Sequence, residues 1–157
     1  MMQIRPARFE DLPALVTLER TATLAAAPQA YPSAASFPLT QHLAATESEF
    51  SDPWITFTVA EDAEGLCGWV KYTEDQLRHL VIADRMQDTD LRDQLYSEGL
   101  RHWRTGAVTG VRQWLLAEDW RARAYFETHR WVPTGRVRRS AFDPHPVLAE
   151  YLLTPNI

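Results

Sequence analysis

The sequence predicts one domain of the mixed α/β (α+β) class, in which a sheet and helices share one core. Three observations support this prediction. The chain has 157 residues, which fits a single domain spanning residues 1–157. Hydrophobic residues make up 45% and charged residues 24%, the usage of a globular chain. Short apolar runs alternate with helix-period patterns from end to end, and no internal repeat is present.

The N-terminal third predicts a strand followed by two helices. A short strand over residues 3–5 is closed by Pro6. A helix follows, because Leu12, Leu15, Val16 and Glu19 recur at helical spacing on one face. Residues 25–38 are rich in Ala, Pro and Ser and predict an irregular connection, and residues 39–50 predict a second helix.

The centre of the chain predicts a β-hairpin and one further strand. Residues 54–60 form a strongly apolar strand pattern, residues 61–65 a turn, and residues 66–73 the returning strand. Residues 76–83 predict the next strand, with apolar positions at Leu77, Leu80, Val81 and Ile82.

The remainder alternates helices with strands. A helix is expected from Asp90 to Gly106, with Leu91, Leu95 and Trp103 on one face. A buried strand over 111–117, a helix over 121–129 and strands over 132–142 and 147–153 complete the order β-α-α-β-β-β-α-β-α-β-β. Among the six tryptophans, Trp54, Trp69 and Trp114 fall in strands and are expected in the core.

Charge and composition exclude several classes of function. The chain has 16 Lys and Arg against 21 Asp and Glu, a net charge of −5, so no nucleic acid partner is expected. The single cysteine, Cys67, forms no internal disulfide and is expected to be buried. No metal site is expected, because the histidines show no metal-ligand spacing. No apolar run is long enough to span a membrane, and the first residues do not read as a signal peptide, so a cytoplasmic protein is expected.

Four segments, in this order, resemble the GNAT (Gcn5-related N-acetyltransferase) superfamily. They are Ile4-Arg5-Pro6-Ala7 with the helix start at residues 10–15, the hairpin at 59–70, the segment 77–95, and Trp131-Val132-Pro133-Thr134-Gly135. The resemblance implies a twisted, mostly antiparallel mixed sheet of about six to seven strands with about four helices. It also implies that strands 76–83 and 111–117 lie adjacent, parallel and splayed at one end.

In that family the wedge between the splayed strands holds acetyl-CoA. The resemblance assigns the pantetheine arm to backbone groups of Leu80, Val81, Ile82 and Ala83. It assigns the pyrophosphate to the loop and helix start formed by Gln87, Asp88, Thr89, Asp90, Leu91 and Arg92. The two small residues of the family's loop are replaced by Asp90 and Arg92. A carboxylate about 5 Å from a phosphate repels it by roughly 3 kcal/mol at an effective dielectric of about 20. Asp90 is also expected to cap the helix with its side chain.

The resemblance also nominates catalytic residues. The family's proton-donating tyrosine falls on Phe126, and Tyr125 is one position away, about 100° around a helix, so Tyr125 is expected to face the sheet. Tyr125, His79 as a base and Glu118 as an amine ligand are the candidate catalytic residues. Each has a structural alternative: Tyr125 in the core, His79 half-exposed, and Glu118 as a solvated loop carboxylate.

Two tryptophans and one basic run each allow a structural and a functional interpretation. Trp120 and Trp131 flank the last helix, where they either line an acceptor cleft or simply pack. The basic run Arg136-Val137-Arg138-Arg139 alternates like an exposed strand face, with an anion site as the other interpretation.

The function implied is transfer of an acetyl group from acetyl-CoA to the amine of a small molecule or peptide. The alternative is a non-catalytic protein of the same fold that binds a ligand or partner and has lost pyrophosphate binding. A homodimer is left open.

Overall fold

The computed structural model describes residues 1–156 and divides the chain into seven strands, four α-helices and four short 3-10 turns. The strands are β1 (Gln3–Pro6), β2 (Thr56–Asp62), β3 (Gly65–Tyr72), β4 (Leu77–Ile82), β5 (Val111–Leu116), β6 (Val132–Arg139) and β7 (Val147–Leu153). The helices are α1 (Leu12–Ala26), α2 (Leu39–Phe50), α3 (Leu91–Thr105) and α4 (Trp120–Thr128). The 3-10 turns are η1 (Phe9–Asp11), η2 (Pro28–Ala30), η3 (Ala34–Ser36) and η4 (Asp84–Met86).

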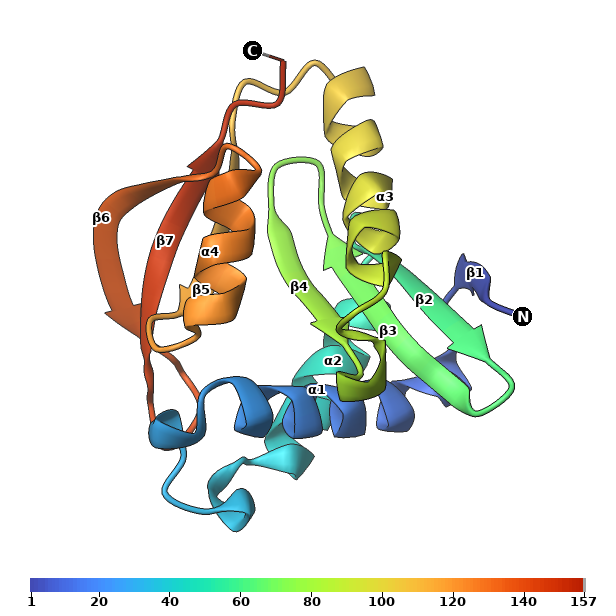
Figure 1. The fold of residues 1–157 in the computed structure, drawn as a ribbon, viewed down its shortest axis with the longest axis vertical. Coiled ribbons are helices and arrows are strands. Elements are labelled where there is room, and N and C mark those ends of the chain that lie inside the picture. Colours follow the sequence, from blue (N-terminus) through green and yellow to red (C-terminus); the bar gives the residue numbers. More distant parts are fainter. Residues whose placement is uncertain (157) are drawn as a thin grey trace.

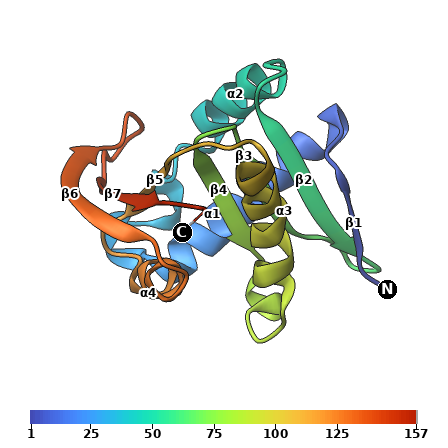
Figure 2. The same ribbon diagram turned by 90° about the horizontal axis from the view of Figure 1, so that it is seen from above.

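The strands form two antiparallel sheets, ordered β1-β2-β3-β4 and β5-β7-β6 (Figure 1). The predicted order of strands and helices is confirmed, and the bounds of α2 and β7 match the predicted ranges. Two views place α3 over one face of the four-stranded sheet and α1 with α2 over the other, and α4 lies against the three-stranded sheet (Figures 1 and 2). No helix in residues 1–156 is long and apolar enough to cross a bilayer.

Two apolar clusters form the core, one on each face of the four-stranded sheet. The cluster under α3 contains Leu91, Leu95 and Trp103, which confirms the predicted helix face. The cluster under α1 contains Leu12, Leu15 and Trp69. Each helix therefore buries the stripe that its sequence period marks.

Trp54 departs from the expectation that it belongs to the core. Its side chain is 77% exposed, because β2 begins at Thr56 and Trp54 lies in the turn before it. Asp52 holds that turn by accepting a hydrogen bond from the Trp54 backbone N–H at 2.9 Å. The Asp-Pro break after α2 therefore extends further than the apolar run suggests.

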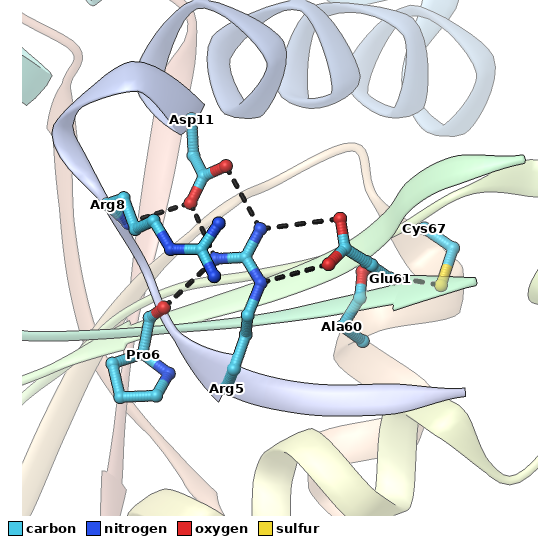
Figure 3. Close-up of polar contacts among 7 residues, drawn as sticks. All are labelled: Arg5, Pro6, Arg8, Asp11, Ala60, Glu61 and Cys67. Atoms are coloured by element: carbon cyan, nitrogen blue, oxygen red, sulfur yellow. Dashed lines mark hydrogen bonds and ion pairs between the residues drawn. The ribbon is translucent and has the colours of Figure 1, made fainter. Parts of the chain in front are cut away.

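A buried arginine joins β1 to the start of α1 (Figure 3). The Arg5 guanidinium donates to both carboxylate oxygens of Asp11, at 2.8 and 3.1 Å, and to Glu61 at 3.1 Å. Asp11 also accepts from the Arg8 backbone N–H at 2.7 Å.

Nearby, Cys67 is fully buried as expected, and burial raises the pKa of its thiol.

The outermost strand, β6, is irregular. Its register against β7 shifts between Pro133 and Val137, and Gly135 has a φ of +85° that side-chain-bearing residues rarely adopt. Val132 and Val137 are more than half exposed.

Candidate functional site

The two sheets meet at a single point between β4 and β5 and then part. Gln76 and Arg112 form an isolated parallel bridge, and the Arg112 backbone N–H donates to the Asp75 carbonyl at 3.0 Å. Beyond this bridge the strands belong to different sheets. The expectation of adjacent, parallel and splayed strands is therefore confirmed.

Strand pairing determines which backbone groups face the opening. The Ala83 N–H donates to the Cys67 carbonyl of β3, and antiparallel residues alternate between facing toward and away from their partner strand. The backbone groups of Val81 and Ala83 therefore point to β3, whereas those of Leu80 and Ile82 point to the opening. Consistent with this, the Ile82 carbonyl accepts from the Gln87 side chain at 3.5 Å.

The same alternation holds on β5. The Ala117 N–H donates to Val147 of β7, whereas the Arg112 N–H points outward to Asp75. The N–H groups of Trp114 and Leu116 therefore face the opening from its other side. Two strand edges with free hydrogen-bonding groups border one space, and this arrangement suits an extended ligand that carries amides.

A cleft of about 690 Å³ fills this opening and continues to both ends of it. Residues 80–82 and 113–116 form its middle. Gln87, Arg92, Asp119 and Arg121, from the starts of α3 and α4, line one end, here called the α3–α4 end. Residues of α1, α2 and the β6–β7 connection line the other, here called the α1–α2 end.

Two arginines line the α3–α4 end without a carboxylate contact. The Arg92 side chain donates to the Gln87 amide oxygen at 3.0 Å and lies over the Tyr125 ring, 5.3 Å from its centroid. Burial lowers the Arg92 pKa. Within residues 1–156, neither Arg92 nor Arg121 forms an ion pair with a carboxylate, so both charges are available to an anion.

Two acidic residues of the segment before α3, Asp88 and Asp90, lie outside the cleft lining, whereas Asp84 of the same segment borders the cleft. Asp88 and Asp90 are exposed and border no part of it. Asp90 occupies the cap position of α3, but its carboxylate accepts from the Gln94 side chain at 3.2 Å and caps no backbone group. The expected cap is wrong because Asp90 has φ −87° and ψ 10° instead of the extended backbone of a capping residue. Thr89 accepts from the Leu91 N–H instead, at 3.3 Å.

A buried carboxylate lies between two histidines at the α1–α2 end. Glu19 Oε2 is 3.1 Å from His79 Nε2 and 3.5 Å from His42 Nδ1. Burial alone would raise the Glu19 pKa, but His79 and His42 outweigh it, and the pKa lies well below its ordinary value. The carboxylate therefore stays ionised and holds the proton of His79 on Nε2.

The remaining nitrogens of these histidines have no partner. His79 Nδ1 and His42 Nε2 are buried and make no hydrogen bond with residues 1–156. The His79 ring stacks on Trp69 with 5.4 Å between centroids, which fixes its plane. With Nε2 facing Glu19, Nδ1 is the ring nitrogen of His79 that is left without a partner among residues 1–156.

Aromatic rings and a second buried ion pair surround the histidines. His42 stacks between Phe37 and Phe142, with centroid distances of 4.4 and 4.3 Å. Lys71, only 2% exposed, donates to Glu49 at 2.7 Å, and burial lowers its pKa although Glu49 opposes the shift. This end of the cleft is therefore aromatic and charged.

The other two predicted catalytic residues, Tyr125 and Glu118, do not line the cleft. Tyr125 faces α3 rather than the sheet: its hydroxyl donates to Asp93 at 2.6 Å, and burial together with this bond raises its pKa. Phe126 takes the core-facing position and also borders the cleft. Glu118 lines a smaller surface pocket, whereas Asp119 turns into the cleft and caps α4 through the Ala122 N–H at 3.0 Å.

The tryptophans beside α4 do not line the cleft. Trp120 is 70% exposed and lies under Arg123, and Trp131 is in the core, where its indole donates to Tyr96 at 2.9 Å. From the basic run, Arg138 and Arg139 do reach the cleft.

Sequence reasoning did not select Glu19, His42 or Arg121 as site residues. A signal existed for Glu19, because it occupies a core-facing position of an apolar helical stripe, where a lone carboxylate needs a partner. His42 and Arg121 give no such signal, since their positions depend on how α2 and α4 dock.

Solved structures similar to this chain include several acetyltransferases. The ribosomal-protein-S18-alanine N-acetyltransferase of Escherichia coli superposes with a TM-score of 0.73 at 15% identity, over 100% of this chain and 96% of that one. A Salmonella typhimurium protein described as an acetyltransferase, solved with its cofactor acetyl-CoA, gives 0.69 at 14% identity, over 100% and 95%. A protein of Desulfovibrio desulfuricans assigned to the GNAT family gives 0.72 at 12% identity, over 99% of each chain.

No protein-family model matches the sequence. No curated protein matches it either. The likeness is therefore one of architecture. The chain has the fold of the GNAT N-acetyltransferases.

Proposed function

We propose that this chain is an N-acetyltransferase that uses acetyl-CoA as co-substrate and a primary amine as acceptor. The observation that carries the proposal is the cleft between β4 and β5, which has free backbone groups along its middle and a paired histidine at one end. The solved Salmonella protein of this fold contains acetyl-CoA, which supports the choice of donor.

The donor occupies the middle of the cleft and its α3–α4 end. Backbone groups of Leu80 and Ile82 bond the amides of the pantetheine arm as a neighbouring strand would. Arg92 and Arg121 take the pyrophosphate, supplying charge where the loop lacks the glycines typical of the family. Asp88 and Asp90 are exposed and lie outside the cleft lining, so their repulsion is weaker than the sequence alone indicates.

His79 acts as the base at the acceptor end. The amine nitrogen forms a bond to the thioester carbonyl carbon, the C–S bond breaks, and sulfur leaves with the electron pair. The proton that the amine loses passes through water to the His79–Glu19 pair, because His79 Nδ1 is buried and Nε2 faces Glu19. The thiolate takes a proton from solvent. Glu19 holds the imidazole in the required tautomer and stabilises its charge once it is protonated.

Calorimetric titration with acetyl-CoA, followed by a thiol-release assay with primary amines, tests the proposal. The double change Arg92→Gln with Arg121→Gln should weaken acetyl-CoA binding at least tenfold. Arg101→Gln, on the exposed side of α3 and paired with Glu98, should leave binding unchanged. His79→Gln should keep the affinity but lower thiol release by roughly 10²–10⁴-fold.

Two outcomes would contradict the proposal. Absence of acetyl-CoA binding would exclude the donor. Binding without amine-dependent thiol release would show a ligand-binding protein of this fold, the alternative that the altered loop raised.

A further inference from the structure

The charge of the cleft differs from that of the whole chain. Six Lys and Arg side chains line it against four carboxylates, although acidic residues exceed basic ones over the full sequence. A cleft with excess cations in an acidic protein favours anionic groups on its ligands. Arg92 and Arg121 are assigned to the pyrophosphate at the α3–α4 end. The other four cationic side chains that line the cleft are Lys71, Arg78, Arg138 and Arg139.

Most cations at the α1–α2 end are already neutralised. Lys71 and Arg78 both donate to Glu49, at 2.7 and 2.8 Å. The two histidines share Glu19. The charges of Lys71 and Arg78 are thus paired within the protein and are not available to a substrate.

Arg138 and Arg139, at the end of β6, are different. Within residues 1–156 neither contacts a carboxylate; Arg139 donates only to the His145 carbonyl, at 3.1 Å. The Arg138 guanidinium lies over the Trp114 indole, 4.2 Å from the ring centroid. Stacking orients a planar guanidinium and leaves its N–H edge free to bond an oxyanion.

Arg136, on the same strand, differs from Arg138 because its charge is paired within the protein. Arg136 also approaches the Trp114 ring, at 5.8 Å, but it forms an ion pair with buried Glu150 at 3.5 Å and does not line the cleft. Two residues further along, Arg138 turns into the cleft without such a partner.

We propose that the acceptor is a small amine that also carries a carboxylate or similar oxyanion, as free amino acids do, and that Arg138, supported by Arg139, binds that group. This proposal rests on the proposed acetyl transfer and names its substrate class. The stacked rings of Phe37, His42 and Phe142 line the same end of the cleft. The cleft of about 690 Å³ must also hold the donor, which favours a compact acceptor.

Matched pairs of amines that differ only in the carboxylate test the proposal. Suitable pairs are phenylalanine and phenethylamine, histidine and histamine, and leucine and isopentylamine. KM from thiol release and Kd from calorimetry, with and without CoA, are measured for each. The carboxylated member should have a KM and Kd at least tenfold lower. The aminophosphonic analogue of phenylalanine shows whether a phosphonate replaces the carboxylate.

Variants assign the effect to Arg138. Arg138→Gln should reduce the preference to less than twofold, and Arg138→Lys should retain part of it, because charge remains while stacking is lost. Arg136→Gln is the matched control and should keep the full preference. Thermal melting checks that each variant is folded.

The outcomes separate this proposal from the proposed function. Equal use of both members of every pair, or a preference that survives Arg138→Gln, overturns the substrate class while acetyl transfer stands. Failure of every carboxylated amine to bind or react, in a protein that binds acetyl-CoA, also overturns it. If acetyl-CoA itself does not bind, the proposed function fails, and binding of the pairs without CoA still decides the oxyanion site.

Discussion

Arg5 is the residue that most clearly couples two elements through charge. Its side chain is 8% exposed, and its guanidinium donates hydrogen bonds to both Asp11 and Glu61 (Figure 3). The hydrogen bond from Arg5 lowers the pKa of Asp11 below its ordinary 3.8, with a further contribution from the Arg8 backbone. A carboxylate whose pKa is lower in the folded state stabilises the fold above its unfolded pKa and loses that contribution as the pH falls through the folded pKa.

We therefore expect Asp11→Asn to lower the free energy of unfolding by about 2 kcal/mol near neutral pH, since a charge-assisted contact to buried Arg5 is lost. The difference from the unchanged protein should shrink as the pH falls below about 3.8, where Asp11 itself becomes protonated. Urea unfolding across this range measures both effects. Glu10→Gln, a change in an exposed neighbour, is the control, and an equal loss there would assign the effect to general charge.

Tyr125 provides a second prediction. Tyr125→Phe keeps the ring over Arg92 but removes the hydroxyl bonded to Asp93. Stability should fall by at most about 1 kcal/mol, and thiol release should change by less than about twofold, because the hydroxyl does not face the cleft. A loss of a hundredfold in thiol release would instead identify Tyr125 as the proton donor, in a helix position different from the one observed.

At the scale of elements, the starts of α3 and α4 differ in the group that caps them. Asp119→Ala should cost about 1 kcal/mol of stability, because the Asp119 carboxylate accepts from the Ala122 N–H. Asp90→Ala should change stability by less than about 0.5 kcal/mol, because its carboxylate caps nothing. Thermal unfolding of the two variants compares them directly. A larger loss at Asp90 would restore the cap predicted from the sequence.

The packing of α3 on β3 depends on one glycine. A Cβ at Gly68 would lie 3.0 Å from Leu95 Cδ1 and 3.1 Å from the Val81 carbonyl oxygen. Gly68→Ala should therefore destabilise the protein by roughly 1–3 kcal/mol. Adding Leu95→Val, which removes the nearest side-chain atom, should recover part of this loss. If the two changes are simply additive in denaturant unfolding, the close approach of α3 is not the cause.

At the scale of the whole molecule, the two sheets touch through one bridge and are otherwise joined by core packing and the cleft walls. A ligand that bonds both strand edges should stabilise the folded state. At about 100 times its Kd, acetyl-CoA should add roughly 2.7 kcal/mol, measured as a rise in melting temperature. Hydrogen exchange at the Leu80 and Ile82 amides should slow more than at Val81, whose N–H already faces β3. Equal protection of all three would contradict the assigned strand alternation.

Local sequence patterns predicted the elements well and their docking poorly. The core face of α3 follows from Leu91, Leu95 and Trp103, because helical spacing is a property of the sequence itself. The partners of Glu19 do not follow, because His42 and His79 reach it from α2 and β4, far apart in the chain. Asp90 shows a third case: its residue type suits a cap, but the backbone angles imposed by the preceding turn decide against it.

The irregularity of β6 protects the folded protein from aggregation through this edge of the sheet. An outermost strand with two exposed valines offers an edge to which another strand can add, and such addition begins aggregation. In β6 the register shift and the positive φ of Gly135 make that edge irregular. Pro133 removes one hydrogen-bond donor, and three arginines place like charges along the strand. The strand that presents Arg138 to the cleft is thereby a poor template for a growing sheet.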